Sequence, residues 1–290
     1  MEYKSSKKRK KTKKRTKREI KNDKISEDDA FVIELLYEQI SSLIIFFISN
    51  TFFYRYGQYA LYEAIFNGSY GEKLSAWENF IKANVFSVSA SLAGVQINME
   101  RYRQQCRRKA YGKIHYSLEP ERKIAVSAIM SFFLFLFQLI GGIGIYKRSF
   151  FHYESNRKEL ERIYNIELEA FQIRYLADYF MLKSTIMSIK LINSKYYEKN
   201  DLSHNMDNPD IPAIIAGQLY VIQRALLLYA NYYVYKGLLK KYNKYEDNFL
   251  LLPNIIIIIG NIIGLFGNII ALIGFIEIYN RNVNQPIFGR

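Results

Sequence analysis

The sequence has few of the residues from which catalytic and metal sites are usually built. It holds one cysteine, Cys106, so no disulfide can form within the chain and a cysteine metal site lacks ligands. Its three histidines are scattered, with no pair at the spacing of metal ligands. The motifs GxxxxGK[ST], GxSxG, HExxH and CxxC are all absent. We therefore expect no metal, no cofactor and no enzymatic activity.

One group of side chains keeps a membrane enzyme as a third-ranked alternative. His115 lies near Glu119 and Glu121 in the sequence, which gathers an imidazole and two carboxylates in one charged loop. Acid–base catalysis uses such groups, but nothing nearby completes a set of catalytic partners. Loss of an activity on changing His115 or Glu121 would support this alternative.

Long uncharged stretches are what the sequence has in abundance. Residues 249–276 are 28 consecutive residues without a charge, and a helix needs about 20 apolar residues to cross a bilayer core of about 30 Å. We expect an all-α fold, a polytopic helical membrane protein of the cell membrane. Five spans are predicted, at about 39–62, 83–99, 124–146, 212–235 and 251–276. Four remain if residues 211–235 are peripheral.

Small residues form a seam along the last predicted span. Their spacings of 4, 3, 4 and 3 place them on one helix face: Gly260, Gly264, Gly267, Ala271 and Gly274. Such a seam lets another backbone approach closely, which is how helices associate in lipid. We expect it to pack helices and to support self-association into an oligomer.

Asparagines form a second stripe on the same helix. Asn254, Asn261 and Asn268 repeat every seven residues. An unpaired amide in hydrocarbon costs several kcal/mol, so these side chains should face protein or water. Two roles stay open: hydrogen bonds that fix helix packing, or the lining of a path for an ion or small solute.

The preceding segment, residues 211–235, carries a charge at the depth of the bilayer centre. Arg224 and Asn231 lie seven residues apart and share one stripe. An arginine facing lipid there costs between about 3 and more than 10 kcal/mol, so Arg224 should face protein or water. In an antiparallel hairpin the partner at similar depth is Asn261 or Asn268. The alternative is that this segment stays outside the membrane as one arm of a peripheral hairpin.

Residues 147–210 have the composition of a soluble segment with one long amphipathic helix. Its apolar face must be covered by another helix, and Arg174 and Asp178 form one of its i,i+4 ion pairs. An alternative function follows from this helix. The protein would then be a membrane-anchored scaffold or effector that acts through residues 154–195 and the basic tail.

The basic tail comprises residues 1–24, which hold 13 lysines and arginines and no apolar periodicity. We expect residues 1–25 to be disordered and the tail to bind anionic lipids, at about 1 kcal/mol per basic residue near the surface. Nucleic-acid binding is not expected, because no aromatic residue beyond Tyr3 accompanies the charges.

Basic residues also set the expected orientation and domain plan. Residues 100–123 hold eight lysines and arginines, so this loop and the N-terminus are expected in the cytoplasm. Five spans then put residues 147–210 outside, residues 236–248 inside and the C-terminus outside. The expected domains are the tail, an N-terminal membrane region at 26–146, the soluble segment at 147–210 and a membrane hairpin at 211–290.

Overall fold

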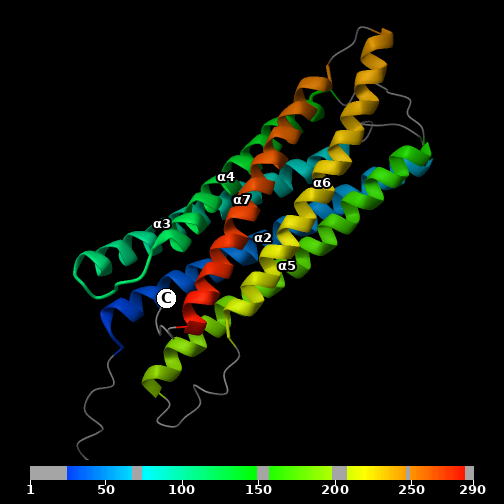
Figure 1. Ribbon diagram of the computed structural model, residues 1–290. Coiled ribbons are helices and arrows are strands. Elements are labelled where there is room, and N and C mark those ends of the chain that lie inside the picture. The colour runs from blue at the N-terminus through cyan, green and yellow to red at the C-terminus, as the bar shows by residue number, and fades with distance from the viewer. Residues whose placement is uncertain (1–24, 67–73, 149–156, 198–207, 246–248, 285–290) are drawn as a thin grey trace, which may run out of the picture.

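The computed structural model describes residues 25–66, 74–148, 157–197, 208–245 and 249–284. In these residues it contains six α-helices and no strand (Figure 1). The helices are α2 (Glu27–Phe66), α3 (Leu74–Ala110), α4 (Glu119–Tyr146), α5 (Arg157–Tyr197), α6 (Asp210–Tyr245) and α7 (Leu251–Asn284). The all-α prediction is confirmed. The basic tail lies outside the described residues, so its disorder and its lipid binding stay predictions.

Local sequence explains several helix ends. The Ser26 hydroxyl accepts a hydrogen bond from the backbone N–H of Asp29 at 3.1 Å, and acidic residues fill the first turn of α2. Both features satisfy the positive N-terminus of a helix. At the end of α3, basic residues occupy the last turn, and Gly112 beyond it takes the left-handed conformation at a φ of 66°. Glycine adopts that conformation without steric cost.

Five of the six helices are long and apolar enough to cross a membrane: α2, α3, α4, α6 and α7. The fold is therefore compatible with an integral membrane protein. The six helices contain 28 to 41 residues, which at 1.5 Å per residue makes them about 42–62 Å long. They exceed a hydrocarbon core of about 30 Å, so each predicted span is a part of a longer helix.

The six helices form one closed ring. Each packs against two neighbours, in the order α2, α3, α4, α7, α6, α5 and back to α2. Between helices that are not neighbours in the ring, no Cα atoms of the described residues come within 8 Å of each other. No helix backbone of the described residues runs along the axis of this ring, so the axis holds side chains and empty space.

Successive helices run in opposite directions between two ends of the bundle. End A holds the start of α2 beside the end of α5, where Val32 and Leu36 pack on Ile189 and Ile192 (Figure 1, lower left). The end of α7 lies there too, because Arg281 binds Glu121 at the start of α4.

End B is the opposite end of the bundle. The guanidinium of Arg157 donates to the carbonyl of Phe66 at 3.2 Å, which joins the start of α5 to the end of α2. The end of α6 and the start of α7 also lie at this end (Figure 1, upper right).

This arrangement differs from the five-span plan in the place of α5. That plan treats residues 147–210 as one soluble segment on a single side, whereas α5 packs against both α2 and α6 and runs from end B to end A. It also puts residues 236–248 on the same side as residues 100–123, whereas the end of α6 lies at end B and the end of α3 at end A. The mean hydropathy of a segment includes every charged residue, whichever way its side chain points. Arg174 and Asp178 made α5 look soluble, although both side chains face inward and are 3% and 1% exposed.

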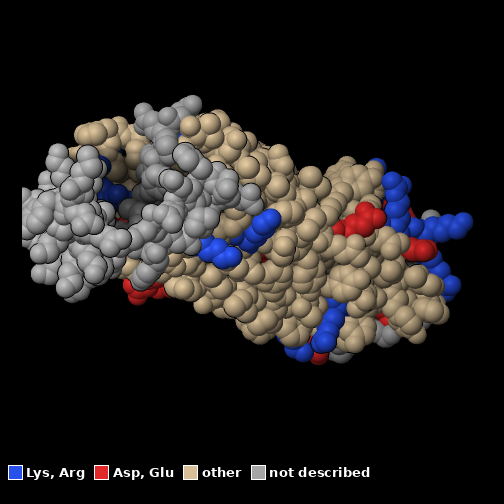
Figure 2. Space-filling view, turned by 90° about the horizontal axis from the view of Figure 1, so that it is seen from below, with Lys and Arg blue, Asp and Glu red and all other residues tan. Residues whose placement is uncertain are grey.

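The middle of α5 exposes apolar side chains on the outer surface of the ring, as its neighbours do. Leu176 and Tyr179 are exposed on α5 at 47% and 53%, as Ile48 is on α2 and Ile222 on α6. Between Glu169 and Lys183 the exposed side chains of α5 carry no charge. On the face in Figure 2, most of the surface is uncharged, and the charged side chains stand in small separate groups.

The glycine seam of α7 is occupied within the chain. A Cβ atom on Gly264 would lie 2.7 Å from Leu134, and one on Gly260 would lie 3.0 Å from the carbonyl oxygen of the same residue. Gly267 and Gly274 meet α4 in the same way, at Met130 and Pro120. The seam thus packs α7 against α4, so these glycines are not on a free surface. Self-association of the protein stays a prediction.

Candidate functional site: a polar cavity inside the helix ring

The ring encloses a cavity of about 210 Å³ to which all six helices contribute. Its wall is mixed. Apolar side chains of α2, α4 and α7 line one part, among them Phe46, Phe135 and Phe275. Polar side chains from all six helices line it too, with serines on α2, α3 and α4 and with larger polar groups on α5, α6 and α7, among them Arg174, Asp178, Tyr220, Gln223, Arg224 and Asn268. The cavity is therefore amphipathic and lies midway along apolar helices.

Arg224 is the charge in this cavity that has the fewest partners. Its Nη1 donates to the Oδ1 atom of Asn261 at 2.8 Å, and Gln138 donates to the same oxygen at 2.9 Å. Its Nε is buried without a hydrogen-bond partner, and the residue is 3% exposed. No carboxylate oxygen of the described residues lies within 4.0 Å of its guanidinium. A buried guanidinium with one neutral acceptor is costly unless an anion joins it.

Arg174 and Asp178 form a second charged group on α5. The Nε of Arg174 lies 4.0 Å from an Asp178 carboxylate oxygen, and its guanidinium lies 4.9 Å from the ring centre of Phe135. Asp178 also accepts hydrogen bonds from Asn50 at 2.6 Å and from the Tyr220 hydroxyl. The carboxylate thus binds its own neighbours, and no ion pair joins it to Arg224.

Gln223 stands next to Arg224 and also lines the cavity. It is completely buried, and neither its amide nitrogen nor its amide oxygen has a hydrogen-bond partner. An amide buried without partners costs about 1–3 kcal/mol. An unpaired amide beside an unbalanced guanidinium marks this part of the wall as a place for a polar ligand.

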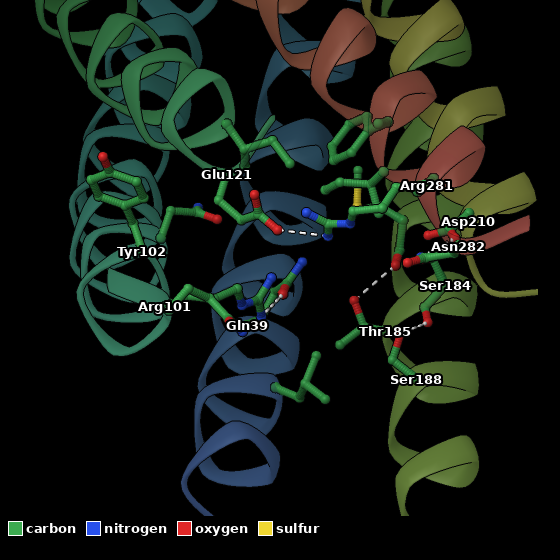
Figure 3. Close-up of a pocket in the computed structure, with 18 of the residues that line it drawn as sticks. Gln39, Arg101, Tyr102, Glu121, Ser184, Thr185, Ser188, Asp210, Arg281 and Asn282 are labelled. Atoms are coloured by element: carbon green, nitrogen blue, oxygen red, sulfur yellow. Dashed lines mark hydrogen bonds and ion pairs between the residues drawn. The ribbon is translucent and has the colours of Figure 1, made fainter. Parts of the chain in front are cut away.

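A second space of about 80 Å³, the vestibule, lies next to the cavity on the side of end A, since several residues line both spaces, among them Gln39, Arg101 and Met181. Figure 3 looks into this vestibule, where Arg281 and Glu121 point toward each other and join at 2.7 Å. On the side of α2 and α3, Arg101 donates to Gln39 at 3.0 Å.

Tyr116 covers the Arg281 side of the vestibule from the loop before α4. The guanidinium of Arg281 lies 4.2 Å from the centre of its ring. Burial raises the pKa of the Tyr116 phenol, which therefore stays neutral in this position. The Arg281–Glu121 pair and the tyrosine together narrow the entrance from end A.

Toward end B the axis of the ring is filled by aromatic side chains. Phe53 lies 5.3 Å from Phe171 and 5.7 Å from Phe80, while Tyr56 and Trp77 pack on the same group. Only a void of about 20 Å³ is found among them, which is room for about one water molecule. The cavity thus has a second space beside it toward end A and tightly packed aromatic side chains toward end B.

The predicted polar residues fall into two groups. Arg224 and Asn261 bind each other, and Asn268 lines the cavity while donating to the Tyr220 carbonyl at 2.9 Å. Asn254 and Asn231 instead donate to carbonyls of their own helices, at Leu250 and Leu227. Among the seam residues, Ala271 lines the cavity.

Sequence reasoning missed Gln138, Gln223 and the inward orientation of Arg174 and Asp178. For the last two a signal was present. They follow Phe171 by three and seven residues, which places all three on one helix face. Phe171 is itself only 2% exposed. The residues of the enzyme alternative are not brought together: His115 is exposed, whereas Glu121 is buried in its pair with Arg281.

No family model, curated protein or solved structure matches this chain.

Proposed function

We propose that this is a non-enzymatic integral membrane protein whose helix ring encloses a binding site and path for a small anion. The observation that carries the proposal is the unbalanced charge of Arg224 in a cavity lined by all six helices. A buried charge at this depth is expensive, and polar groups inside membranes typically mark a substrate or ion path.

The proposal requires α5 to cross the bilayer with the other five helices. A ring can enclose a water-filled or ligand-filled space in a membrane only if every helix of its wall runs through the same layer. In support, α5 packs on two of the apolar helices, points its charges at Arg174 and Asp178 inward, and exposes apolar side chains outward. Six crossings put both termini on one side.

Basic residues favour end A as the cytoplasmic side. Residues 1–24, which precede α2 in the sequence, hold 13 lysines and arginines, and residues 100–123 hold eight. Residues 67–82, which follow α2 in the sequence, hold two, and residues 236–248, which precede residue 249 of the α7 segment, hold four. Short cytoplasmic loops carry the excess of lysine and arginine. The open vestibule would then face the cytoplasm and the aromatic closure would face outward.

The test is anion flux across liposomes that contain the purified full chain. Nitrate, chloride and acetate are offered in turn, and potassium serves as the cation control. We expect at least one anion to pass faster than in protein-free liposomes. Arg224→Gln should lower that flux at least tenfold, whereas Arg55→Gln, which changes an exposed arginine of α2, should leave it unchanged.

Two results would contradict the proposal. One is the absence of anion flux above the protein-free level. The other is equal flux in Arg224→Gln and wild type, provided that both elute as folded protein in size-exclusion chromatography.

The scaffold alternative finds no specific support in this fold. It needs the apolar face of the helix at 154–195 to be free for a partner. Leu160, Tyr164 and Phe171 of that face are 5%, 3% and 2% exposed, because α2 and α6 cover them.

A further inference from the structure

The balance of charge along the path suits a ligand with one negative charge. The cavity and its vestibule together are lined by four arginines and three carboxylates: Arg101, Arg174, Arg224 and Arg281 against Glu121, Asp178 and Asp210. One positive charge is left without a counterpart. Asp178 is engaged by Asn50, Tyr220 and Arg174, and Glu121 is engaged by Arg281, and neither carboxylate lies within 4.0 Å of the Arg224 guanidinium.

The hydrogen-bonding groups on that wall are ready for a ligand with acceptor oxygens. Arg224 has a buried Nε without a partner, and Gln223 has a buried amide nitrogen without one. A carboxylate is the group that a guanidinium binds best, and its oxygens can also accept from an amide nitrogen.

The rest of the wall and the size of the cavity argue against a bare inorganic ion. A cavity of about 150 Å³ is large enough for benzene, and this one is about 210 Å³. Phe46, Phe135 and Phe275 line it together with aliphatic side chains such as Leu43 and Leu134. A chloride or nitrate ion would leave most of this apolar surface in contact with water, at a cost proportional to its area.

We propose that the cavity binds a small organic monoanion, a carboxylate carried on an apolar body of about the size of a benzene ring. Its carboxylate binds Arg224 and Gln223, and its apolar body fills the space beside Phe46 and Phe275. This inference rests on the proposed function and names the class of ligand that uses the path.

The test is calorimetric titration of the purified full chain in detergent at neutral pH with four probes. Benzoate has the charge and the apolar body, benzamide lacks the charge, acetate lacks the body, and nitrate is inorganic. We expect benzoate to bind with one site per chain and at least tenfold more tightly than each of the other three.

Two variants locate the site. Arg224→Gln should bring benzoate binding down to the benzamide level. Gln223→Met keeps the size of the side chain and removes no hydrogen bond of the described residues, so it should fold and still weaken benzoate binding about tenfold or more. Arg55→Gln is the control and should bind benzoate as wild type does.

The outcomes separate this inference from the proposed function. Acetate or nitrate binding as tightly as benzoate, with nitrate flux present, would overturn the organic class and leave the anion path in place. Benzamide binding as tightly as benzoate would overturn charge recognition. Absence of binding by all four probes together with absence of anion flux would overturn both proposals.

Discussion

Replacing Gln223 by Met is the change for which a binding role and a structural role predict opposite results. The side chain is fully buried, and both of its polar atoms lack partners. Such an amide costs about 1–3 kcal/mol, and a methionine of similar shape removes that cost. Stability without ligand should therefore rise by about 1–3 kcal/mol. For a chain of 290 residues that is an increase of about 2–5 °C in apparent Tm.

Function should change in the other direction. If the Gln223 amide donates to a bound anion, its loss removes a hydrogen bond to a charged group, worth about 1.5–3 kcal/mol. Anion flux at low concentration should then fall by about 10- to 150-fold. The assays are a thermal unfolding scan and the liposome flux assay. Gln218→Met, the same change on the exposed side of α6, should alter neither. A lower Tm with unchanged flux would refute the reasoning, because it would mean that the amide serves packing alone.

Two further predictions concern the packing of the ring. Gly141→Ala should destabilise the protein by about 1–3 kcal/mol, because its Cβ would lie 2.5 Å from Ile257 and 2.8 Å from the Pro253 carbonyl oxygen. Gly237→Ala is the control: its Cβ would have no atom within 4 Å, so this variant should be more stable by about 0.4–1 kcal/mol. Equal Tm changes for the two variants would contradict the close packing of α4 on α7. At the vestibule, Glu121→Gln and Arg281→Gln should each lower the free energy of unfolding by about 1–3 kcal/mol. In a double-mutant cycle, the double variant should lose at least about 0.5 kcal/mol less than the sum of the two single losses. Strict additivity would show that the two side chains do not couple.

Much of the fold follows from the sequence, since uncharged stretches of sufficient length predict helices that can cross a bilayer. The sequence also predicts that Arg224 meets Asn261 or Asn268 at similar depth in an antiparallel hairpin. In the structure, Arg224 Nη1 lies 2.8 Å from Asn261 Oδ1. The position of α5 does not follow, because hydropathy averages over all side chains of a window. Arg174 and Asp178 lower the average although both face the axis of the ring.

The asparagine stripe shows a second limit of periodicity. Asn254, Asn261 and Asn268 repeat with one period, yet their partners differ. Asn254 donates to the carbonyl of Leu250 in its own helix, Asn261 accepts from Arg224, and Asn268 donates to α6. A period fixes the face of a helix, whereas the partner depends on which helix lies opposite. The order of the helices in the ring decides which helix lies opposite, and the sequence pattern of a single helix does not encode that order.

A path through the helix ring depends most directly on α5 crossing the bilayer, and cysteine labelling of the two ends of α5 measures this. In a Cys106→Ser background, single cysteines replace Glu161 or Lys190, two exposed residues about 44 Å apart along the helix. Intact cells are treated with a membrane-impermeant maleimide. We predict labelling of Glu161→Cys in intact cells and of Lys190→Cys only after permeabilisation. Labelling of both positions from the same side would contradict the six-helix ring as a membrane-spanning unit, and with it the proposed path.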